Sequence, residues 1–405
     1  MTPESLLDRI DDQHALEFLA SMVRIKTYSG TAGEGELAHV MAGAMGELGM
    51  TTDLTEVEPG RLNAVGRWPG TGGGSSLLFN GHLDTNPATD GWTVDPLGGL
   101  YDDDFIYGIG VSNMKAGDAA AFCAVKTLVD AGVSLQGDVV LEYVIGELQG
   151  GVGTVRAIED GVRADYFINM EPTDLNGLTL HAGAFNFVIE LHGITRHVSK
   201  REDGVDSIAA ACALVPRLDA TTFSGAQDDQ HLSVNRCNVG VLRGSLTPDF
   251  HDWRPPQVAD YARLVGTARY APSQSEDSVM ADLRLLLDDL EAEFPGLRAV
   301  VSKEHEGDRP TMLPFEVAHE SPIVRAVDAA HRRVRGTDLC CGPVKPYCFY
   351  GTDAAHLLHR AGMEGIVCGP GGRYNTMPDE RVDRADYLDM IRIYLLATVE
   401  VCGLV

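Results

Sequence analysis

The sequence predicts an α/β protein in which a mostly parallel central sheet is flanked by helices, with a smaller α+β domain inserted into it. In the first part of the chain, short apolar runs typical of buried strands alternate with helical segments, as they do around a parallel sheet. After residue 183 the apolar and polar residues alternate, which is typical of strands with one exposed face. The elements there follow the β-α-β-β-α-β order of a ferredoxin-like domain.

The elements of the first part follow from their apolar patterns. Leucine, isoleucine and methionine recur at helical spacing over 5–26, and the pattern continues over 34–48. The apolar run at 76–80 ends at a glycine, which indicates a buried strand that leads into a functional loop. The other elements expected here are a helix over 114–131, a strand over 138–145, a helix over 150–158 and a strand over 165–170.

The insert begins with an alternating strand at 185–191. The elements expected after it are a helix at 204–217, a strand at 234–243, an extended loop at 244–256, a strand at 259–269 and a helix at 275–291. From residue 297 the α/β pattern returns, with helices at 322–334, 352–361 and 385–400. We therefore place the catalytic domain at 1–182 and 297–405, and the lid at 183–296.

Composition excludes several classes of protein. The chain of 405 residues has 32 basic and 59 acidic side chains and a formal net charge of −27, which argues against binding to nucleic acid or to an anionic membrane. No run approaches the roughly 18 apolar residues that a membrane span needs. The N-terminus lacks the pattern of a secretory signal, and the eight cysteines show no paired spacing, so we expect reduced thiols in a cytoplasmic protein.

Polar residues that could carry chemistry gather in four short segments. Residues 80–85 read Asn-Gly-His-Leu-Asp-Thr, and residues 107–115 read Tyr-Gly-Ile-Gly-Val-Ser-Asn-Met-Lys. Residues 147–151 read Glu-Leu-Gln-Gly-Gly, and residues 171–173 read Glu-Pro-Thr. Imidazole nitrogen and carboxylate oxygen are the ligands of a catalytic metal, and a carboxylate is also a suitable general base.

In sequence and order, these segments resemble the zinc aminoacylase, acetylornithine deacetylase and carboxypeptidase G family, which hydrolyses amide bonds with a paired metal centre. Matching segments run from residue 76 to residue 400. The resemblance implies that His82 is the first histidine ligand and that Asp84 orients its imidazole. It also implies that Glu147 is the general base and that Glu171 is a carboxylate ligand of the first metal.

Three positions depart from the pattern of that family. Asn113 stands where the family has the aspartate that bridges the two metals, and its uncharged amide cannot supply an anionic bridge. Leu148 replaces a glutamate that binds the second metal. The last ligand, a histidine four residues before Glu380, is replaced by Thr376, or by Asn375 if one residue is inserted. The second metal would therefore lose all its protein ligands.

The first metal would keep His82 and Glu171 with the neutral oxygen of Asn113 beside them. Catalytic zinc usually has three protein ligands, so we expect no metal, or at most one weakly bound zinc ion. The kept residues could instead form a hydrogen-bonded remnant that holds a loop. A buried carboxylate without partners is costly, however, so we interpret their retention as the sign of a polar pocket.

The resemblance implies further site residues. His197 matches a histidine that stabilises the oxyanion, often across a dimer interface, although Arg201 replaces the proline expected nearby. Arg269 matches a strand arginine, and it could contact substrate or form a structural ion pair. Gly371 belongs to a glycine-rich turn that would bind a substrate carboxylate, and Arg373 could add charge to it. The expected substrate contacts also include Asn113, Glu171 and Asn375.

Two functions follow from this pattern. The first is an enzyme that acts on an amide-bearing or amino-acid-like small molecule, with Glu147 as general acid and base; the reaction could be hydrolysis, elimination, isomerisation or amide formation. The second is a non-catalytic binding or regulatory protein that kept the scaffold. In both cases we expect a homodimer through the lid domain, and Glu147→Gln distinguishes the two functions.

Overall fold

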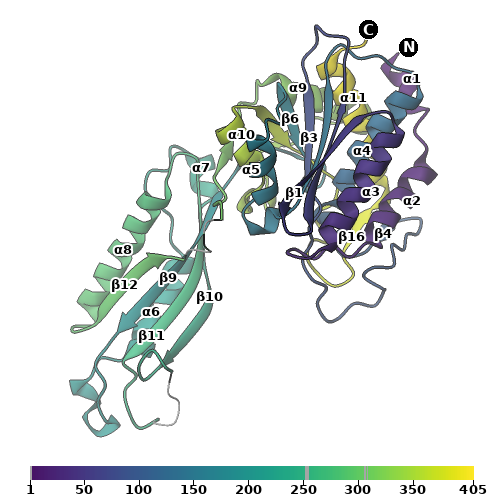
Figure 1. Cartoon of the computed structure of the whole chain (residues 1–405). Helices are drawn as coiled ribbons and strands as arrows, with labels where there is room; N and C mark the ends of the chain where they lie inside the picture. Colours follow the sequence, from purple (N-terminus) through teal and green to yellow (C-terminus); the bar gives the residue numbers. More distant parts are fainter. Residues whose placement is uncertain (1, 251–254, 305–306, 308) are drawn as a thin grey trace. The chain divides into compact units, whose positions relative to one another are not determined.

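The chain divides into two compact units (Figure 1). The structure is a computed structural model that describes residues 2–250, 255–304, 307 and 309–405. The first compact unit, which we call the larger unit, comprises the residues up to Leu180, Phe315–Tyr347 and Thr352–Val405. The second, the smaller unit, comprises His181–Pro314 and Cys348–Gly351.

The larger unit is organised by an eight-stranded sheet with the strand order β1-β2-β5-β3-β6-β15-β7-β14. The pairs β5–β3, β3–β6 and β6–β15 at its centre are parallel, whereas β1–β2 and β2–β5 are antiparallel. The strands are β1 (Thr51–Glu58), β2 (Arg61–Trp68), β3 (Leu77–His82), β5 (Val139–Val144), β6 (Tyr166–Asn169), β7 (Gly177–Leu178), β14 (Cys341–Gly342) and β15 (Glu364–Val367). Short strands also occur at β4 (Phe105–Tyr107), β8 (Leu180–His181), β13 (Phe315–Glu316) and β16 (Arg381–Asp383).

Helices cover this sheet, and the predicted α/β class is confirmed. The core between helices and sheet is formed by fully buried side chains such as Phe79, Tyr143 and Tyr394. Helix α11 packs against α4 and α9, and α10 packs against α5. The helices are α1 (Pro3–Leu7), α2 (Asp12–Val23), α3 (Gly33–Glu47), α4 (Ala116–Asp130), α5 (Val152–Glu159), α9 (Pro322–Arg335), α10 (Ala354–Ala361) and α11 (Arg384–Cys402).

Two predictions for the first part of the chain need correction. The single helix expected over 5–26 is two helices, because the Asp11 side chain accepts a hydrogen bond from the His14 backbone N–H and begins a new helix. Strands β1 and β2 were not predicted. Strand β1 has no buried residue, so its sequence carries no regular apolar pattern.

The smaller unit is a four-stranded antiparallel sheet with the strand order β10-β11-β9-β12. Its elements are β9 (Gly183–His192), α6 (Ser207–Asp219), α7 (Asp229–Ser233), β10 (Arg236–Ser245), β11 (Tyr261–Tyr270), α8 (Glu276–Glu293) and β12 (Arg298–Lys303). The smaller unit extends to Pro314, beyond the expected end at residue 296, because β12 pairs with β9. Strand β10 is an edge of the sheet, and dimerisation through this unit stays a prediction.

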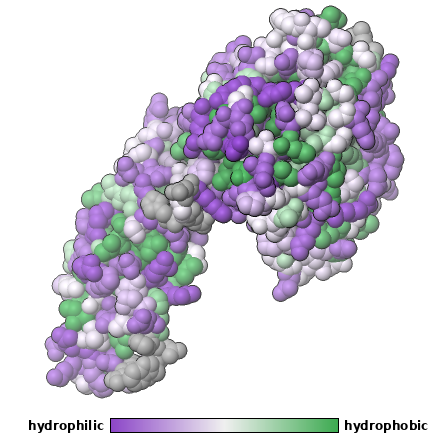
Figure 2. All heavy atoms as spheres, viewed as in Figure 1, coloured by the Kyte–Doolittle hydropathy of each residue, from purple (hydrophilic) through white to green (hydrophobic). Residues whose placement is uncertain are grey.

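The surface agrees with the acidic composition. Figure 2 shows hydrophilic residues spread over the visible face of both units, with hydrophobic residues scattered among them. Within the described part of the chain, no helix combines the length and the apolar character that a membrane crossing requires.

Candidate active site

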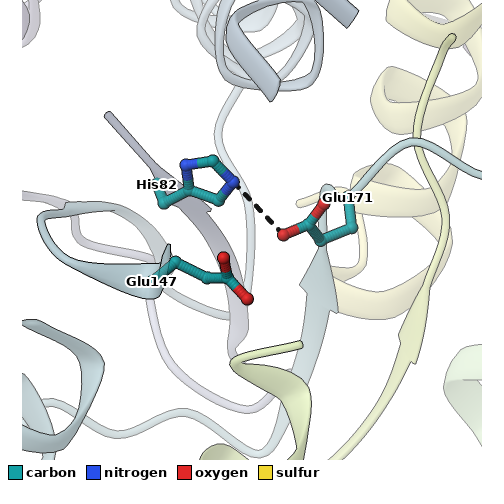
Figure 3. A group of neighbouring side chains, drawn as sticks. All are labelled: His82, Glu147 and Glu171. Carbon is teal, nitrogen blue, oxygen red and sulfur yellow. Dashed lines mark ion pairs between the residues drawn. The ribbon is translucent and has the colours of Figure 1, made fainter. Parts of the chain in front are cut away.

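Three side chains of the larger unit converge where neighbouring parallel strands end. His82 is the last residue of β3, Glu147 begins a short 3-10 turn after β5, and Glu171 follows β6 (Figure 3). Because the carboxyl ends of parallel strands meet at one edge of a sheet, the three side chains point toward one another. Each offers an atom that could bind a metal, and these three atoms lie within 4.8 Å of one another.

The hydrogen bonds of His82 fix the direction of its ring. Its Nδ1 lies 2.8 Å from the backbone carbonyl oxygen of Asp84, and a carbonyl only accepts, so Nδ1 carries the proton. The other nitrogen, Nε2, lies 3.3 Å from Oε1 of Glu171 and 3.0 Å from Oδ1 of Asn113. A neutral imidazole would direct its lone pair at these two oxygens. The position therefore suits a proton or a metal cation on Nε2.

The charges in this cluster change the protonation of its members. Burial lowers the pKa of His82, but the negative charges of Glu171, Asp84 and Glu147 outweigh burial and raise the pKa well above its ordinary value. Burial and the charge of Glu171 raise the pKa of the Glu147 carboxyl well above its ordinary value. A raised pKa makes the ionised carboxylate a stronger base, and the same carboxyl can afterwards give the proton back as a general acid.

Asp84 connects His82 to the turn that carries Glu147. Its Oδ1 accepts a hydrogen bond from the Glu147 backbone N–H at 3.2 Å, and its Oδ2 accepts one from the Leu148 backbone N–H at 3.3 Å. The Ser29 hydroxyl donates to Oδ2 at 2.8 Å. Oδ1 also lies 3.6 Å from Nδ1 of His82. A single buried carboxylate thus positions the imidazole loop and the Glu147 turn together.

A buried ion pair supports the same turn from the other side. Arg61 donates from Nη2 to Oε1 of Glu34 at 2.6 Å, and from Nη1 to Oε1 of Gln149 at 2.7 Å. Glu34 in turn accepts from the backbone N–H of Gly30 at 3.1 Å. Sequence reasoning missed this pair, because no motif connects residues that lie so far apart in the chain.

A polar network lies behind the cluster. Asn80 donates to Glu142 Oε2 at 2.8 Å and to the Thr154 hydroxyl at 3.0 Å, and that hydroxyl donates to Asp353 Oδ2 at 2.7 Å. Burial raises the pKa of Glu142 to about 7 and that of Asp353 to about 7. A glutamate inside the apolar run at 138–145 was the signal that could have revealed this network.

The three altered positions border the cluster on its other side. Asn113 lies against Nε2 of His82, whereas Leu148 points partly into solvent with 39% of its surface exposed. Glu380 accepts hydrogen bonds from the Asn113 and Ser112 backbone N–H groups, which anchors the segment of Asn375 and Thr376 to the Asn113 turn. Oδ1 of Asn375 is buried with no hydrogen-bond partner among the described residues.

The remaining predicted site residues are not part of this cluster. Arg373 forms ion pairs with Asp174 at 2.7 Å, Asp383 at 3.4 Å and Asp386 at 3.5 Å, so its charge is shared among three carboxylates. Gly371 packs so closely on Ser112 that a Cβ there would lie 2.5 Å from its hydroxyl oxygen.

His197 and Arg269 lie in the smaller unit. His197 is exposed and its Nδ1 accepts from the Ser199 backbone N–H at 3.3 Å, and Arg269 is half-buried on β11. The roles of these two residues stay predictions.

Comparison with known proteins places this site in a family. The sequence model described as "Peptidase family M20/M25/M40" matches residues 78–400. The chain is 27% identical over 392 residues to N-formyl-4-amino-5-aminomethyl-2-methylpyrimidine deformylase of Bacillus subtilis, covering 90% of this chain and 88% of the relative. It is 25% identical over 351 residues to acetylornithine deacetylase of Vibrio vulnificus, covering 84% and 85%.

Solved structures share the fold. Aminopeptidase PepT of Bacillus cereus superposes with a TM-score of 0.77 at 18% identity, covering 97% of this chain and 99% of that chain. A dinuclear metal-binding peptidase of the M20 family from Bacillus subtilis superposes with a TM-score of 0.66 at 17% identity, covering 96% and 99%. Both likenesses concern the whole chain rather than one of its units.

Proposed function

Since the chain belongs to the peptidase family M20/M25/M40, we propose that it is an amide hydrolase with its active site at His82, Glu147 and Glu171, and that it works with at most one divalent cation. The observation that carries this proposal is the convergence of one imidazole and two carboxylates within 4.8 Å at the end of the central strands. His82 and Glu171 would supply two protein ligands for a zinc ion, and Glu147 lies close enough to be a third ligand or the general base.

The donor atoms present suit one cation. Nε2 of His82 faces the oxygens of Glu171 and Asn113, which is an unfavourable arrangement for a neutral imidazole unless a proton or a cation lies between them. His82 and Glu171 would hold the cation, and Glu147 would either bind it or remain free as the base. A bound zinc ion would polarise the scissile carbonyl and acidify a water molecule.

The residues do not suit a second cation. Asn113 and Leu148 carry no charge, and neither Asn375 nor Thr376 provides an imidazole. Leu148 is also partly exposed, so it offers an apolar surface where an anionic ligand would be needed. Two dications held close together require anionic bridging and terminal ligands, and these three positions supply none.

The residues of the chain can carry the proton transfer themselves. Glu147 accepts a proton from the attacking water as the C–O bond forms, and it gives a proton to the leaving nitrogen as the C–N bond breaks. The Asp84 carboxylate holds the backbone of the Glu147 turn, so the carboxyl is directed into the cluster before substrate arrives. We propose that His197 of the smaller unit stabilises the oxyanion, as the family resemblance implies.

The names of the relatives support a proposal for the substrate class. The deformylase and the deacetylase are named for the removal of a small acyl group from a larger amine-bearing molecule. We propose that this chain also acts on a small N-acyl amine. The alternative is a binding or regulatory protein that kept the cluster without turnover, which the buried position of Glu147 would also permit.

One experiment tests the proposal. Metal content of the purified protein is measured by mass spectrometry, and release of amine is followed with N-formyl and N-acetyl amines, with and without added zinc. Glu147→Gln keeps the size of the side chain but removes its proton transfer, so we expect roughly 100-fold to 10,000-fold slower turnover.

Leu148→Gln, at the neighbouring position of the same turn, is the matched control, and we expect its rate to stay within about threefold, in keeping with the small effects of surface substitutions. About two equivalents of zinc per chain would contradict the single-cation site. Equal turnover of wild type and Glu147→Gln would favour the non-catalytic alternative.

A further inference from the structure

The aspartate at the start of helix α10 does not cap that helix. Asp353 occupies the N-cap position, where an aspartate ordinarily accepts a hydrogen bond from a backbone N–H of the first turn. Its side chain makes no such bond. The backbone N–H of Ala354 donates instead to the Thr352 hydroxyl at 3.2 Å. Capping therefore does not explain the Asp353 carboxyl.

The Asp353 carboxyl contacts helix α5 instead. Its Oδ2 accepts a hydrogen bond from the Thr154 hydroxyl at 2.7 Å, whereas its Oδ1 is buried with no hydrogen-bond partner among the described residues. Only 1% of Asp353 is exposed, and burying an unpartnered carboxyl oxygen is costly. Buried polar atoms without partners are rare in folded proteins, and catalytic sites are one of the places where they occur. A contact that only joined α10 to α5 would not require this cost.

The unpartnered oxygen lies against the turn that carries Glu147. A Cβ on Gly151 would lie 2.3 Å from Oδ1 of Asp353, so a larger residue at position 151 would collide with the carboxyl. The backbone N–H of Gly151 closes the turn, because it lies 3.0 Å from the carbonyl oxygen of Gly146 and 3.2 Å from that of Glu147. The Asp353 carboxyl thus forms a wall against which the closed turn packs.

His356 contacts the same turn from the next position along this face of α10. Its Nε2 lies 2.9 Å from the carbonyl oxygen of Gly150, and a carbonyl only accepts, so Nε2 carries the proton. Burial lowers the pKa of His356 to about 4, so the ring is neutral at neutral pH. A Cβ on Gly151 would lie 2.8 Å from the same Nε2. Asp353 and His356 therefore enclose the end of the turn together.

Glu147 is the first residue of the 3-10 turn, and its carboxyl points into the cluster (Figure 3). The Asp84 carboxylate accepts a hydrogen bond from the Glu147 backbone N–H and so holds the start of the turn. Asp353 packs against the end of the turn at Gly151. Because a displacement of about 1 Å can cost a hundredfold in rate, the two contacts together would fix the base in the geometry that the reaction requires.

We propose that Asp353 is a positioning residue for the general base: held by the Thr154 hydroxyl, its carboxyl fixes the end of the turn at Gly151 and so directs the Glu147 carboxyl at the attacking water. The inference rests on the proposed function, because Asp353 acts through Glu147 and contacts neither substrate nor metal. It predicts that loss of the Asp353 carboxyl lowers kcat while KM and zinc content stay nearly constant.

Asp353→Ala is measured in two backgrounds. In the wild-type background we expect kcat to fall about 10-fold to 100-fold and KM to stay within about threefold. In the Glu147→Gln background, followed by single turnover with enzyme in excess, we expect a further decrease of less than about threefold, because residues that act as one unit are not additive. Equal losses in the two backgrounds would overturn the inference, since a general structural defect lowers both rates.

Thr154→Val removes the hydroxyl that holds Asp353, and we expect it to lower kcat as Asp353→Ala does, whereas Thr154→Ser keeps a hydroxyl and should restore kcat to within about threefold of the wild type. This pair decides the question if Asp353→Ala does not fold. Asp11→Ala is the matched control, because Asp11 is the N-cap of α2 in the same unit; it should lower stability without changing kcat. Equal kcat of the two Thr154 variants, or an equal loss in Asp11→Ala, would contradict the proposal.

Hydrogen–deuterium exchange of the peptide over residues 146–153 measures the turn without turnover. We expect faster exchange in Asp353→Ala than in the wild type, with the exchange of β3 unchanged. If this holds but no N-acyl amine is hydrolysed, Asp353 positions the turn and the hydrolase proposal is wrong. If amides are hydrolysed and Asp353→Ala changes neither the exchange nor kcat, the hydrolase proposal stands and the role of Asp353 is wrong.

Discussion

The residues of the cluster that match the family and those that depart from it differ in how they are built. We call His82, Asp84, Glu147 and Glu171 the kept side, and positions 113, 148 and 375–377 the altered side. On the kept side, His82, Asp84, Glu147 and Glu171 expose at most 7% of their surface, and Asp84 accepts three hydrogen bonds. On the altered side, 39% of Leu148 and 43% of Met377 are exposed. The charged groups therefore lie where the fold holds them in place, whereas part of the altered side faces solvent.

The comparison teaches that the retained groups depend on supporting contacts, some made by motif residues and some by residues outside the motifs. Asp84 and the pair of Glu34 and Arg61 fix the turn that carries Glu147, and the network of Asn80 and Glu142 lies behind it. A remnant without function would have no need for such a supported, electrostatically costly cluster. The altered side, by contrast, carries the uncharged residues Asn113 and Leu148, which need no ionic partner.

Restoring the altered side should give the largest effect. A triple variant with Asn113→Asp, Leu148→Glu and either Asn375→His or Thr376→His returns the ligands of the second metal. We expect it to bind one more equivalent of zinc than the wild type, measured by mass spectrometry. At a thousandfold excess of zinc over Kd, the gain in unfolding free energy should be about 4 kcal/mol, measured by urea denaturation.

Without zinc, the same triple variant should be less stable than the wild type, because two added carboxylates would repel Glu147 and Glu171. The control is the single histidine variant at the same position, which adds an imidazole but no bridging anion. If the triple variant binds no more zinc than that control, the difference between the two sides lies in the backbone rather than in the three side chains.

The supporting network gives a smaller effect that depends on pH. Burial raises the pKa of Glu142 to about 7, whereas an unfolded glutamate titrates near 4.5. Between these values the folded state binds more protons than the unfolded state, so this residue lowers stability as the pH rises from about 4.5 to 7. Glu142→Gln cannot ionise, and it should gain about 3 kcal/mol relative to the wild type between pH 4.5 and pH 8.

Urea denaturation of both proteins at several pH values measures this gain. Glu159→Gln is a suitable control, because Glu159 ends helix α5 at the surface, and its stability difference from wild type should hardly change with pH. A constant difference between Glu142→Gln and the wild type would mean that Glu142 is already ionised in the folded protein.

The sequence predicted most of the fold and the kept side of the cluster. Apolar runs identified β3, β5 and β6, and parallel strands end at one edge, so His82, Glu147 and Glu171 had to meet. Strand β1 was missed because none of its residues is buried, so its sequence gives no regular apolar pattern. A local pattern predicts an element only where burial imposes that pattern.

The contacts that hold the Glu147 turn in place could not be predicted in the same way. Arg61 meets Glu34 and Gln149 only after the chain has folded, and nothing in their local sequences connects them. The motifs identified His82, Asp84, Glu147 and Glu171, whereas the contacts of Arg61 with Glu34 and Gln149 are specified by the three-dimensional fold alone.

Asp84→Asn should give the smallest of these effects and tests whether the kept side acts as one unit. An asparagine side chain has one acceptor oxygen with two lone pairs, so it cannot accept all three hydrogen bonds from the Ser29 hydroxyl and the backbone N–H groups of Glu147 and Leu148. Loss of such a partner typically lowers metal affinity or activity about 10-fold to 100-fold. Metal titration and kcat/KM measure the two quantities.

The titration of His82 distinguishes a role of Asp84 in positioning the imidazole from a general loss of structure in the Asp84→Asn protein. The Asp84 charge contributes to the raised pKa of His82, so Asp84→Asn should move the titration of His82, followed by NMR, to lower pH. Asp174→Asn is the matched control, because Asp174 pairs with Arg373 instead of with the cluster, and it should leave that titration unchanged. If both variants lose activity equally and neither shifts His82, Asp84 only holds a loop, and the cluster is two separate features rather than one preorganised site.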